Sequence, residues 1–440
     1  MTKKERLQLA EWAKDFALKQ GADEISVGVS KSRNIEIGCR ERKLENLKES
    51  TQNSMALDIY INNRYSSHST NDLRKDALKK FIEGAIASTK YLSEDPYRSL
   101  PDPKFYPKGE LPELDILDEN YEKIDSAQRV KMAEKIEAAA LEKSDKLISV
   151  TSGYNDSFSE TVRVTSNGFS GETTQTVFSA GAEATVRDQN GGRPQDWYWA
   201  STLFQQDLPA PEKLGERAVE KALQKIGQKK IESGQYTMLV DNRSSSRLLG
   251  IFQGPMSGRA LQQKSSYLDG MLNKKIASDK LTVIDDPFVK KGLGSRHFDG
   301  DCLATKRRVL IDKGVLKYFL IDDYYGKKLG MEPTSGSPSN LLFEYGQRSL
   351  EEMQKDIKKG ILVTGFIGGN SNSTTGDFSF GIVGQLIENG KIVQAVNEMN
   401  ISGNAKDLWN KLVEMGNDPY PYSSWQRPSM MFEEIHFSGI

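Results

Sequence analysis

Histidine and cysteine are scarce in this chain of 440 residues, which has only 3 histidines and 2 cysteines. His68, His297 and His436 lie too far apart for any two of them to bind a metal ion from one helix face. Cys39 and Cys302 are too few for a zinc ribbon, an iron–sulfur site or a disulfide framework. These absences exclude a metal or redox centre built from soft ligands within the chain, and they leave oxygen-ligand sites for magnesium or calcium open.

An excess of charge of one sign and long hydrophobic runs are also missing. The chain carries 60 Lys and Arg against 61 Asp and Glu, for a formal net charge of −1. A protein that binds nucleic acid along its whole length would normally be strongly basic. The first residues contain no apolar segment typical of a secretory signal, and the apolar stretch at 360–369 is far shorter than the ~20 residues of a membrane span. We therefore expect a soluble cytoplasmic protein with reduced thiols, without direct contact to nucleic acid or membrane.

The first part of the chain mixes helical and strand-like patterns. Residues 4–20 show an amphipathic helical stripe, short alternating runs between 25 and 69 are typical of an antiparallel sheet, and a second helix is predicted over 71–91 with Asn71 as its N-cap. This pattern predicts an α+β subdomain over 1–92. Residues 93–120 contain five of the 15 prolines and should form an extended connector.

After the connector, the next part of the chain begins with a predicted helix over 125–143. Strand-like runs over 147–204, with a hairpin turn at Asn167-Gly168, and a helix over 211–225 complete a central α+β subdomain at 121–230. Beyond it, Gly, Ser and β-branched residues dominate, and Gly314 and Gly390 each mark a hairpin. The fold class expected is α+β, with an α+β N-terminal region followed by a β-rich C-terminal domain over 231–440.

Two short segments suggest binding chemistry but have simpler structural interpretations. The Gly-rich stretch Gly365–Asn370 could hold a phosphate, yet it lacks a Gly-Lys-Ser/Thr ending and a following helix, so a tight turn is favoured. Trp197 and Trp199 could stack on nucleic-acid bases, but packing between strands is favoured because no basic stripe lies beside them.

The segment from Asn370 to Gly381 is the richest in polar groups. Gly376 is expected to form a turn, Asp377 to accept backbone N–H groups, and Phe378 and Phe380 to alternate with Ser379 in a strand. Such a loop has backbone groups that can hold an extended chain. The candidate substrate-strand or loop residues are Asn370, Thr375, Gly376, Asp377, Phe378 and Ser379.

This segment also carries a family resemblance. The runs at 375–381 (Thr-Gly-Asp-Phe-Ser-Phe-Gly), 387–392, 398–403 and 416–418 resemble C-terminal signatures of the TldD/PmbA family, and most closely its PmbA branch, also known as TldE and as a modulator of DNA gyrase. The likeness extends over nearly the whole chain. It implies an α+β N-terminal region, a β-rich C-terminal domain, and a heterodimer with a TldD-like zinc metalloprotease. Such a pair processes a peptide precursor and degrades an antitoxin and other unfolded peptides, which lie as an added β-strand.

The chain departs from the catalytic branch of this family at its metal site. That branch has a His-Glu-x-x-x-His helix, and the matching positions here are Gly250, Ile251 and Pro255. None of these side chains can bind zinc or accept a proton from bound water, and Pro255 would break the helix. No Cys follows residues 416–418. The expectation is therefore a C-terminal domain with a degenerate metalloprotease site, no catalytic residue, no metal in this chain, and zinc in the TldD-like partner.

Two functions follow from these observations. The first is a non-catalytic subunit of a heterodimeric zinc metalloprotease that acts on unfolded peptides, with any effect on gyrase arising indirectly through peptide turnover. The alternative is an independent binding protein, homodimeric when alone, or a non-zinc hydrolase that uses the Asn370–Ser379 loop.

Overall fold

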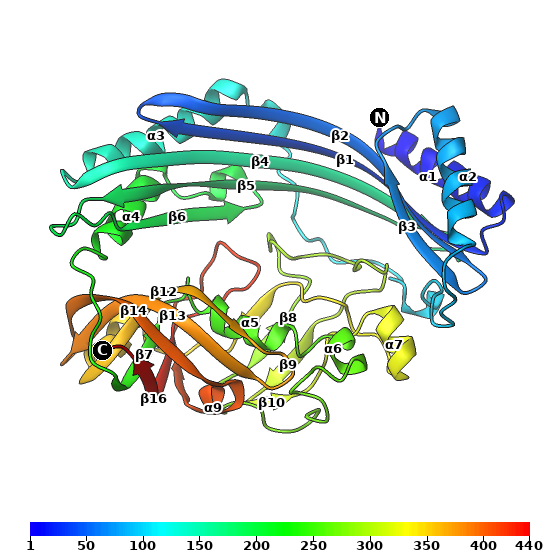
Figure 1. Ribbon diagram of the computed structural model, residues 1–440. Coiled ribbons are helices and arrows are strands. Elements are labelled where there is room, and N and C mark those ends of the chain that lie inside the picture. Colours follow the sequence, from blue (N-terminus) through cyan, green and yellow to red (C-terminus); the bar gives the residue numbers. More distant parts are fainter.

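The computed structural model describes residues 1–440, and its first half is built on one long, six-stranded antiparallel sheet (Figure 1). The strand order is β3-β2-β1-β4-β5-β6. The strands are β1 (Glu24–Arg40), β2 (Lys43–Ile61), β3 (Arg64–Thr70), β4 (Leu147–Thr165), β5 (Ser170–Val186) and β6 (Gln195–Thr202). Strand β1 pairs with β4 along fifteen residues, so the sheet joins segments on both sides of the connector at 93–120.

The two faces of this sheet differ in polarity because successive side chains of a strand point to opposite sides. In β1 the apolar residues Ile25, Val27, Ile35 and Ile37 are buried and occupy odd positions. The even positions of the same strand hold Ser, Gly, Asn and Glu, and they share a face with polar residues of β4 such as Thr161, whose hydroxyl lies 2.9 Å from that of Ser30. The apolar face therefore needs a cover, whereas the polar face can line a solvent-filled space.

Four helices provide that cover. They are α1 (Lys3–Lys19), α2 (Lys75–Thr89), α3 (Ser126–Glu142) and α4 (Pro211–Leu223). Helices α1 and α2 bury their apolar residues against one end of the sheet, and α3 and α4 against the other. Thr2 with Glu5 and Asp125 with Gln128 form capping boxes that define the starts of α1 and α3.

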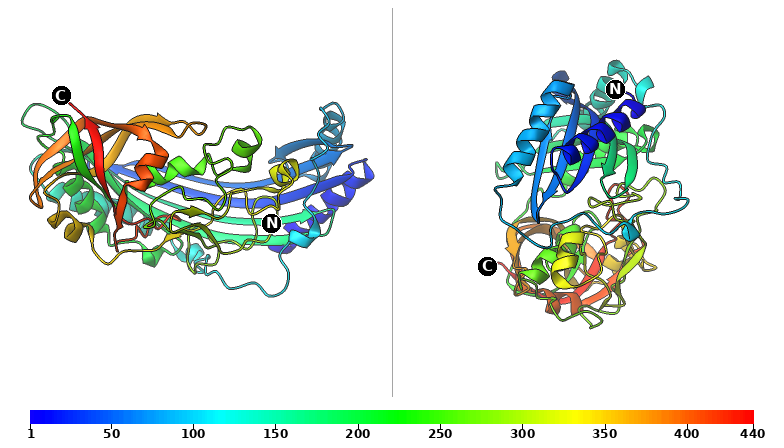
Figure 2. Two further views of the ribbon diagram at one scale, coloured as in Figure 1. Left: turned by 90° about the horizontal axis from the view of Figure 1, so that it is seen from below. Right: turned by 90° about the vertical axis from the view of Figure 1, so that its right-hand side faces the viewer.

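The C-terminal half folds beneath the polar face of the sheet, around a closed ring of strands (Figures 1 and 2). The order β14-β13-β12-β7-β16 closes through pairing of β14 with β16, and β15 extends from β16. These strands are β7 (Gly234–Val240), β12 (Lys359–Ser371), β13 (Asp377–Glu388), β14 (Lys391–Asn404), β15 (Leu412–Met415) and β16 (Met430–Ser438). The expected β-rich C-terminal domain is thus confirmed, and with it the α+β class.

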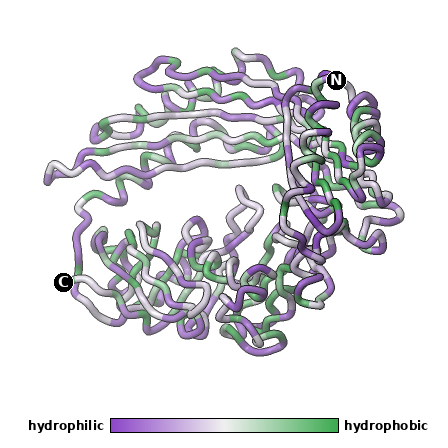
Figure 3. Tube along the Cα trace, turned by 45° about the vertical axis from the view of Figure 1, so that its right-hand side comes forward, coloured by the Kyte–Doolittle hydropathy of each residue, from purple (hydrophilic) through white to green (hydrophobic).

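Shorter elements complete this domain. A four-stranded sheet in the order β10-β9-β8-β11 contains β8 (Val283–Asp285), β9 (Arg308–Asp312), β10 (Val315–Leu316) and β11 (Leu341–Phe343). The helices are α5 (Ser246–Gln253), α6 (Gly258–Gln262), α7 (Asp323–Leu329), α8 (Leu350–Lys355) and α9 (Ala405–Asn410). Together with the barrel strands they enclose an apolar core of 40 buried residues. Figure 3 colours hydrophobic segments of this domain green.

Residues 93–120 run along the molecule without a regular strand or long helix, as the prolines predicted. They contain only the short 3-10 turn η1 (Pro103–Phe105), and η2 (Tyr121–Lys123) follows. The connector contacts both halves: Tyr106 packs on Phe169 of the sheet, and the carbonyl of Pro112 lies 2.8 Å from Nε2 of His297. None of the helices combines the length and hydropathy needed to cross a bilayer. The division into subdomains at 92 and 120 stays a prediction.

Three local predictions were wrong. Asn71 does not cap α2, because the helix begins only at Lys75 after Arg74. The short strands predicted between 25 and 61 are two continuous strands of 17 and 19 residues. The polar stretch of β1 is paired with both β2 and β4, and that of β2 is paired with β1. The Gly365–Asn370 stretch is not a tight turn: it lies inside β12, where Gly368 and Gly369 adopt positive φ angles at a bulge.

Candidate functional site

A cavity of about 600 Å³ lies between the polar face of the sheet and the C-terminal domain. Its volume falls within the ~300–1,000 Å³ typical of ligand sites. The sheet contributes Glu183 and Trp197, which both point from the polar face, and the C-terminal domain contributes the start of α5 and residues 364–368 of β12. The cavity therefore exists only because the two halves of the chain fold over one another.

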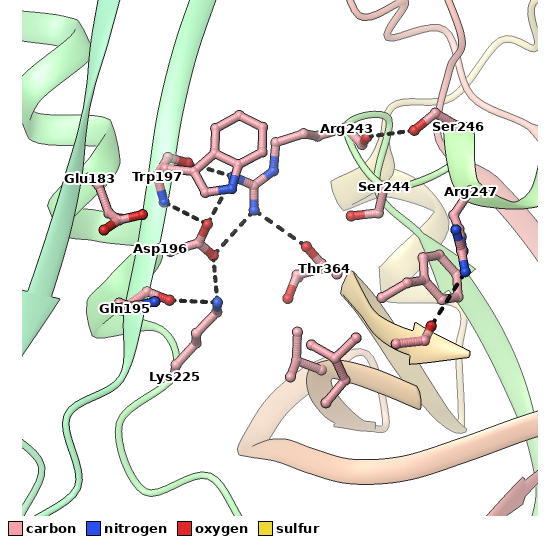
Figure 4. Close-up of a pocket in the computed structure, with 15 residues that line it drawn as sticks. Glu183, Gln195, Asp196, Trp197, Lys225, Arg243, Ser244, Ser246, Arg247 and Thr364 are labelled. Carbon is pink, nitrogen blue, oxygen red and sulfur yellow. Dashed lines mark hydrogen bonds and ion pairs between the residues drawn. The ribbon is translucent and has the colours of Figure 1, made fainter. Parts of the chain in front are cut away.

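A buried ion-pair cluster holds the two halves together at this cavity (Figure 4). Arg243 binds Asp196 of β6 through both terminal nitrogens, at 2.9 and 3.2 Å, and Lys225 Nζ lies 3.0 Å from the same carboxylate. Burial alone would raise the pKa of Asp196, but hydrogen bonds and charge from Arg243, together with Lys225, hold that pKa below its ordinary value. The carboxylate thus stays ionised and orients the guanidinium toward β12.

The edge of β12 that faces the cavity has no neighbouring strand. Strand β7 pairs with β12 only from Gly360 to Val363, and beyond that point β12 pairs with β13 alone. Arg243 donates to the carbonyl of Thr364 at 3.4 Å, and Arg247 donates to the carbonyl of Gly369 at 2.7 Å. Between these two carbonyls, the peptide groups at 365–367 that point away from β13 have no strand partner and can pair with an extended chain.

Helix α5 and the turn after it contain the positions that the family resemblance matches to the metal site of the catalytic branch. A side chain added at Gly250 would meet no atom within 4 Å, so this position faces open space. Ile251 is only 3% exposed and points into the core, and Pro255 is buried beyond the end of the helix at Gln253. The three positions do not converge on one point.

The residues present do not fit a zinc ion. No group of three or more His, Cys, Asp or Glu side chains is close enough together to hold a metal. His68 lies beside Ser66 on β3 and His297 lies beside the connector. Cys39 and Cys302 are both buried and unpaired.

The candidate residues from Asn370 to Ser379 lie at the β12–β13 hairpin, and none of them lines the cavity. Gly376 has a φ of +84°, as its turn position requires. Asp377 accepts from the Thr375 hydroxyl at 2.6 Å and the Asn404 amide at 3.1 Å, which lower its pKa. Its oxygens therefore bind side chains rather than the backbone N–H groups expected. Phe378 is buried on Phe380, and Ser379 bonds with Asn400.

The cavity residues with the strongest interactions escaped the sequence-based prediction. Asp196 and Arg243 are 47 positions apart and belong to different halves of the chain, so no spacing rule links them. For Trp197 and Trp199 the sequence favoured packing between strands, and this is correct for Trp199 only. Trp199 packs against Gly153 and Gly181, where a Cβ would come within 2.8 Å of the indole. Trp197 is 43% exposed, and its ring lies 4.8 Å from the Arg243 guanidinium.

Taken together, the fold is a helix-covered sheet closed over a β-barrel domain, with a polar cavity between them. Family models match almost the entire chain: PmbA/TldA metallopeptidase domain 1 over residues 25–89, the central domain over 119–226, and the C-terminal domain over 233–439. The chain belongs to the PmbA/TldD family of metallopeptidases.

Individual relatives agree with this assignment. A crystal structure from Bacteroides thetaiotaomicron, of a protein named for a suggested modulation of DNA gyrase, superimposes with a TM-score of 0.97 at 44% identity over 100% of both chains. Metalloprotease PmbA of Escherichia coli O157:H7 is 29% identical over 95% of this chain and 93% of its own length. TldE of Thermococcus kodakarensis, at 24% identity and a TM-score of 0.86 over 98% of this chain and 100% of its own, shares the fold.

Proposed function

We propose that this chain is the non-catalytic subunit of a heterodimeric zinc metallopeptidase whose substrates are unfolded peptides. In this role it completes a substrate chamber with a TldD-like partner, and zinc and the catalytic groups come from that partner. Family membership supports the peptidase context, since relatives such as PmbA of E. coli O157:H7 are named metalloproteases.

The observation that carries the proposal is the state of helix α5. At the positions matched to two histidines and a glutamate, the chain has a glycine facing open space, a buried isoleucine and a buried proline past the helix end. Activation of water by zinc needs several ligands that converge on the ion and a nearby base. Neither requirement is met by Gly250, Ile251 and Pro255.

The open edge of β12 supports the role in substrate binding. An extended peptide could add to residues 365–367 through backbone hydrogen bonds, while the polar face of the sheet closes the space above it. Backbone pairing is insensitive to side-chain identity, which suits a subunit that handles unfolded peptides of varied sequence. Gyrase modulation would then be indirect, through peptide turnover, in keeping with a net charge of −1.

The test is to purify this chain alone, its TldD-like partner alone, and the two together. Zinc content is measured for each sample, and cleavage of an unfolded peptide such as reduced, denatured casein is followed. We expect zinc and cleavage only where the partner is present, with co-elution of the two chains on size exclusion. A pair whose partner has lost one zinc ligand serves as the control and should be inactive.

Zinc-dependent cleavage by this chain alone would contradict the proposal. Stable homodimers that never exchange with the partner would favour the alternative of an independent binding protein. A calorimetric titration of Mg²⁺ or Ca²⁺, with Asp377→Ala as the matched variant, tests whether the Asn370–Ser379 loop binds an ion.

A further inference from the structure

A second pocket, of about 470 Å³, opens beside the cavity and has a different chemical character. Arg243 and Thr364 line both spaces, so the two lie side by side along β12. Residues 362 and 364 of β12 border the second pocket, and 364–368 border the cavity. A peptide lying along the open edge of β12 would therefore point one of its ends, or a side chain near that end, into the second pocket.

Three cations of helix α4 project into this pocket. Lys213, Arg217 and Lys221 are spaced by four residues, which places them on one face of the helix. Like charges at this spacing repel one another and destabilise a helix. Because all three line one pocket, that pocket is electrostatically suited to an anion.

The protein itself neutralises these cations only in part. Lys213 has no carboxylate within 4.0 Å and its side chain makes no hydrogen bond within the protein. Lys221 lies 3.8 Å from Asp241, its nearest carboxylate, although its side chain is only 20% exposed. Burial, followed by repulsion from Arg243, lowers the pKa of Lys221. Arg217 shares Glu220, at 3.1 Å, with Lys143.

Three acidic residues, Asp241, Glu351 and Asp418, line the pocket beside four cations, Lys213, Arg217, Lys221 and Arg243, so the formal charge of the lining is positive by one. Asp418 already accepts from the backbone N–H and hydroxyl of Ser429, at 2.9 and 2.7 Å, and burial raises its pKa. Asp241 accepts from the N–H of Ser244 at 2.7 Å. Tyr198 and Tyr422 also line the pocket, and a tyrosine hydroxyl can donate a hydrogen bond to an anion.

We infer that the pocket formed by Lys213, Arg217 and Lys221 binds a carboxylate of the peptide that lies along β12. Carboxylates accept charge-assisted hydrogen bonds from Lys and Arg and further bonds from tyrosine hydroxyls. The carboxylate comes either from the C-terminus of the peptide or from an Asp or Glu side chain. This inference rests on the proposed peptide-binding function and adds a preference for acidic groups at one end of the bound strand.

The test measures binding of four synthetic peptides to the full chain by isothermal titration calorimetry. The probes are acetyl-Thr-Val-Thr-Val-Thr as the free acid, the same peptide as its C-terminal amide, the amide with glutamate as its central residue, and the free acid with alternate backbone nitrogens methylated. We expect the free acid, the glutamate peptide or both to bind about tenfold more tightly than the plain amide, the usual gain from hydrogen bonds to a charged group. Which of the two gains affinity identifies the source of the carboxylate.

Matched variants assign the effect to the pocket. In Lys213→Gln/Lys221→Gln the preference for carboxylate peptides over the plain amide should fall to about onefold, because the charge that distinguishes the two is removed. Lys79→Gln/Lys80→Gln removes the same charge from α2, at the opposite end of the sheet (Figure 1), and should preserve the preference. Thermal unfolding of both variants checks that they are folded.

The outcomes separate this inference from the proposed function. Equal affinity for acid and amide peptides would overturn the carboxylate pocket and leave peptide binding standing. Binding of none of the peptides would overturn both. Binding of the methylated acid as tightly as the unmethylated one, with the lysine dependence retained, would support the pocket and contradict strand addition, because methylation removes the backbone donors.

Discussion

The sheet and the C-terminal domain meet at two ends of the molecule, and the two junctions are built differently. At the cavity end, charged side chains span the gap, with Asp196 of the sheet held by Arg243 of the C-terminal domain. At the connector end, aromatic rings fill it: Phe169 of the sheet packs between Tyr106 and Phe298, with centroid distances of 5.2 and 5.0 Å. The polar junction leaves a solvent-filled space beside it, whereas the aromatic junction is packed.

This difference explains how the sheet and the C-terminal domain can be firmly joined while a cavity stays open between them. Apolar packing stabilises without direction and fills space. A buried ion pair is directional, and its groups must keep their geometry, so it can hold two surfaces apart around a cavity. The connector end therefore carries stability, and the cavity end positions the open edge of β12.

The largest effect on the stability of the fold is expected from loss of the aromatic junction. Phe169→Ala should lower the free energy of unfolding by about 3–5 kcal/mol, since Phe169 is only 6% exposed and its removal leaves a void among rings. Urea denaturation followed by circular dichroism measures the change. Trp197→Ala at the cavity end is the matched control and should cost about 1 kcal/mol, because that ring is 43% exposed and mainly faces Arg243. Equal losses of unfolding free energy in the two variants would contradict the conclusion that the connector end contributes more to stability than the cavity end.

Breaking the ion pair should have the next largest effect. Arg243→Met leaves Asp196 buried with Lys225 as its only cationic partner, and we expect a loss of about 3 kcal/mol in the same denaturation assay. Because much of this loss comes from the stranded carboxylate, the double variant Arg243→Met/Asp196→Asn should be more stable than the sum of the single losses implies. Strict additivity in this double-mutant cycle would show that the pair does not act as a unit.

The two junctions should also respond to pH with opposite signs. Near the connector end, burial and then the charge of Asp301 raise the pKa of Asp299 to about 6. A carboxyl group whose pKa is raised on folding stabilises the fold at low pH, and this contribution is lost as pH rises through about 6. We expect Asp299→Asn to increase the free energy of unfolding at pH 8 by on the order of 1–3 kcal/mol, with little change at pH 4.

Asp196 provides the opposite case at the cavity end. Its pKa is lowered in the folded protein, so its contribution is present above the ordinary carboxyl pKa of about 4 and is lost as pH falls through the lowered folded value. Asp196→Asn should therefore cost stability at pH 7, and the cost should shrink toward pH 3. Denaturant unfolding at four pH values distinguishes the two cases. If the change in unfolding free energy varied with pH in the same way for Asp299→Asn and Asp196→Asn, the opposite pKa shifts assigned to the two carboxyl groups would be refuted.

The smallest effect is expected on α5, which begins at the cavity. Gly250→Ala should raise the free energy of unfolding by about 0.5–1 kcal/mol, because the position is helical and the added methyl group meets no atom within 4 Å. Thermal unfolding measures the gain. Gly181→Ala is the contrasting variant and should destabilise, since its Cβ would lie 2.2 Å from the carbonyl oxygen of Tyr198. A loss of stability in Gly250→Ala would mean that other atoms cover this face of α5.

Much of the secondary structure could be predicted because it depends on local patterns. Capping residues Thr2 and Asp125 define helix starts, and Asn167-Gly168 and Asn389-Gly390 define hairpin turns. The prediction was wrong where distant pairing overrides local preference. The polar stretch of β1 between Ser30 and Asn34 is a strand because β2 and β4 flank it on both sides, and Gly368 and Gly369 form a bulge rather than a turn because β13 lies beside them.

The sequence by itself determined the class of fold, the β-rich C-terminal half and the family resemblance carried by residues 375–381. It also determined that Gly250, Ile251 and Pro255 cannot supply metal ligands, because ligand chemistry depends on residue type alone. Only the tertiary structure decided where a ligand could bind. The cavity, the Asp196–Arg243 pair and the pocket beside α4 arise from segments that are remote in the chain, and their electrostatics depend on burial and distances that exist only after the sheet closes over the barrel.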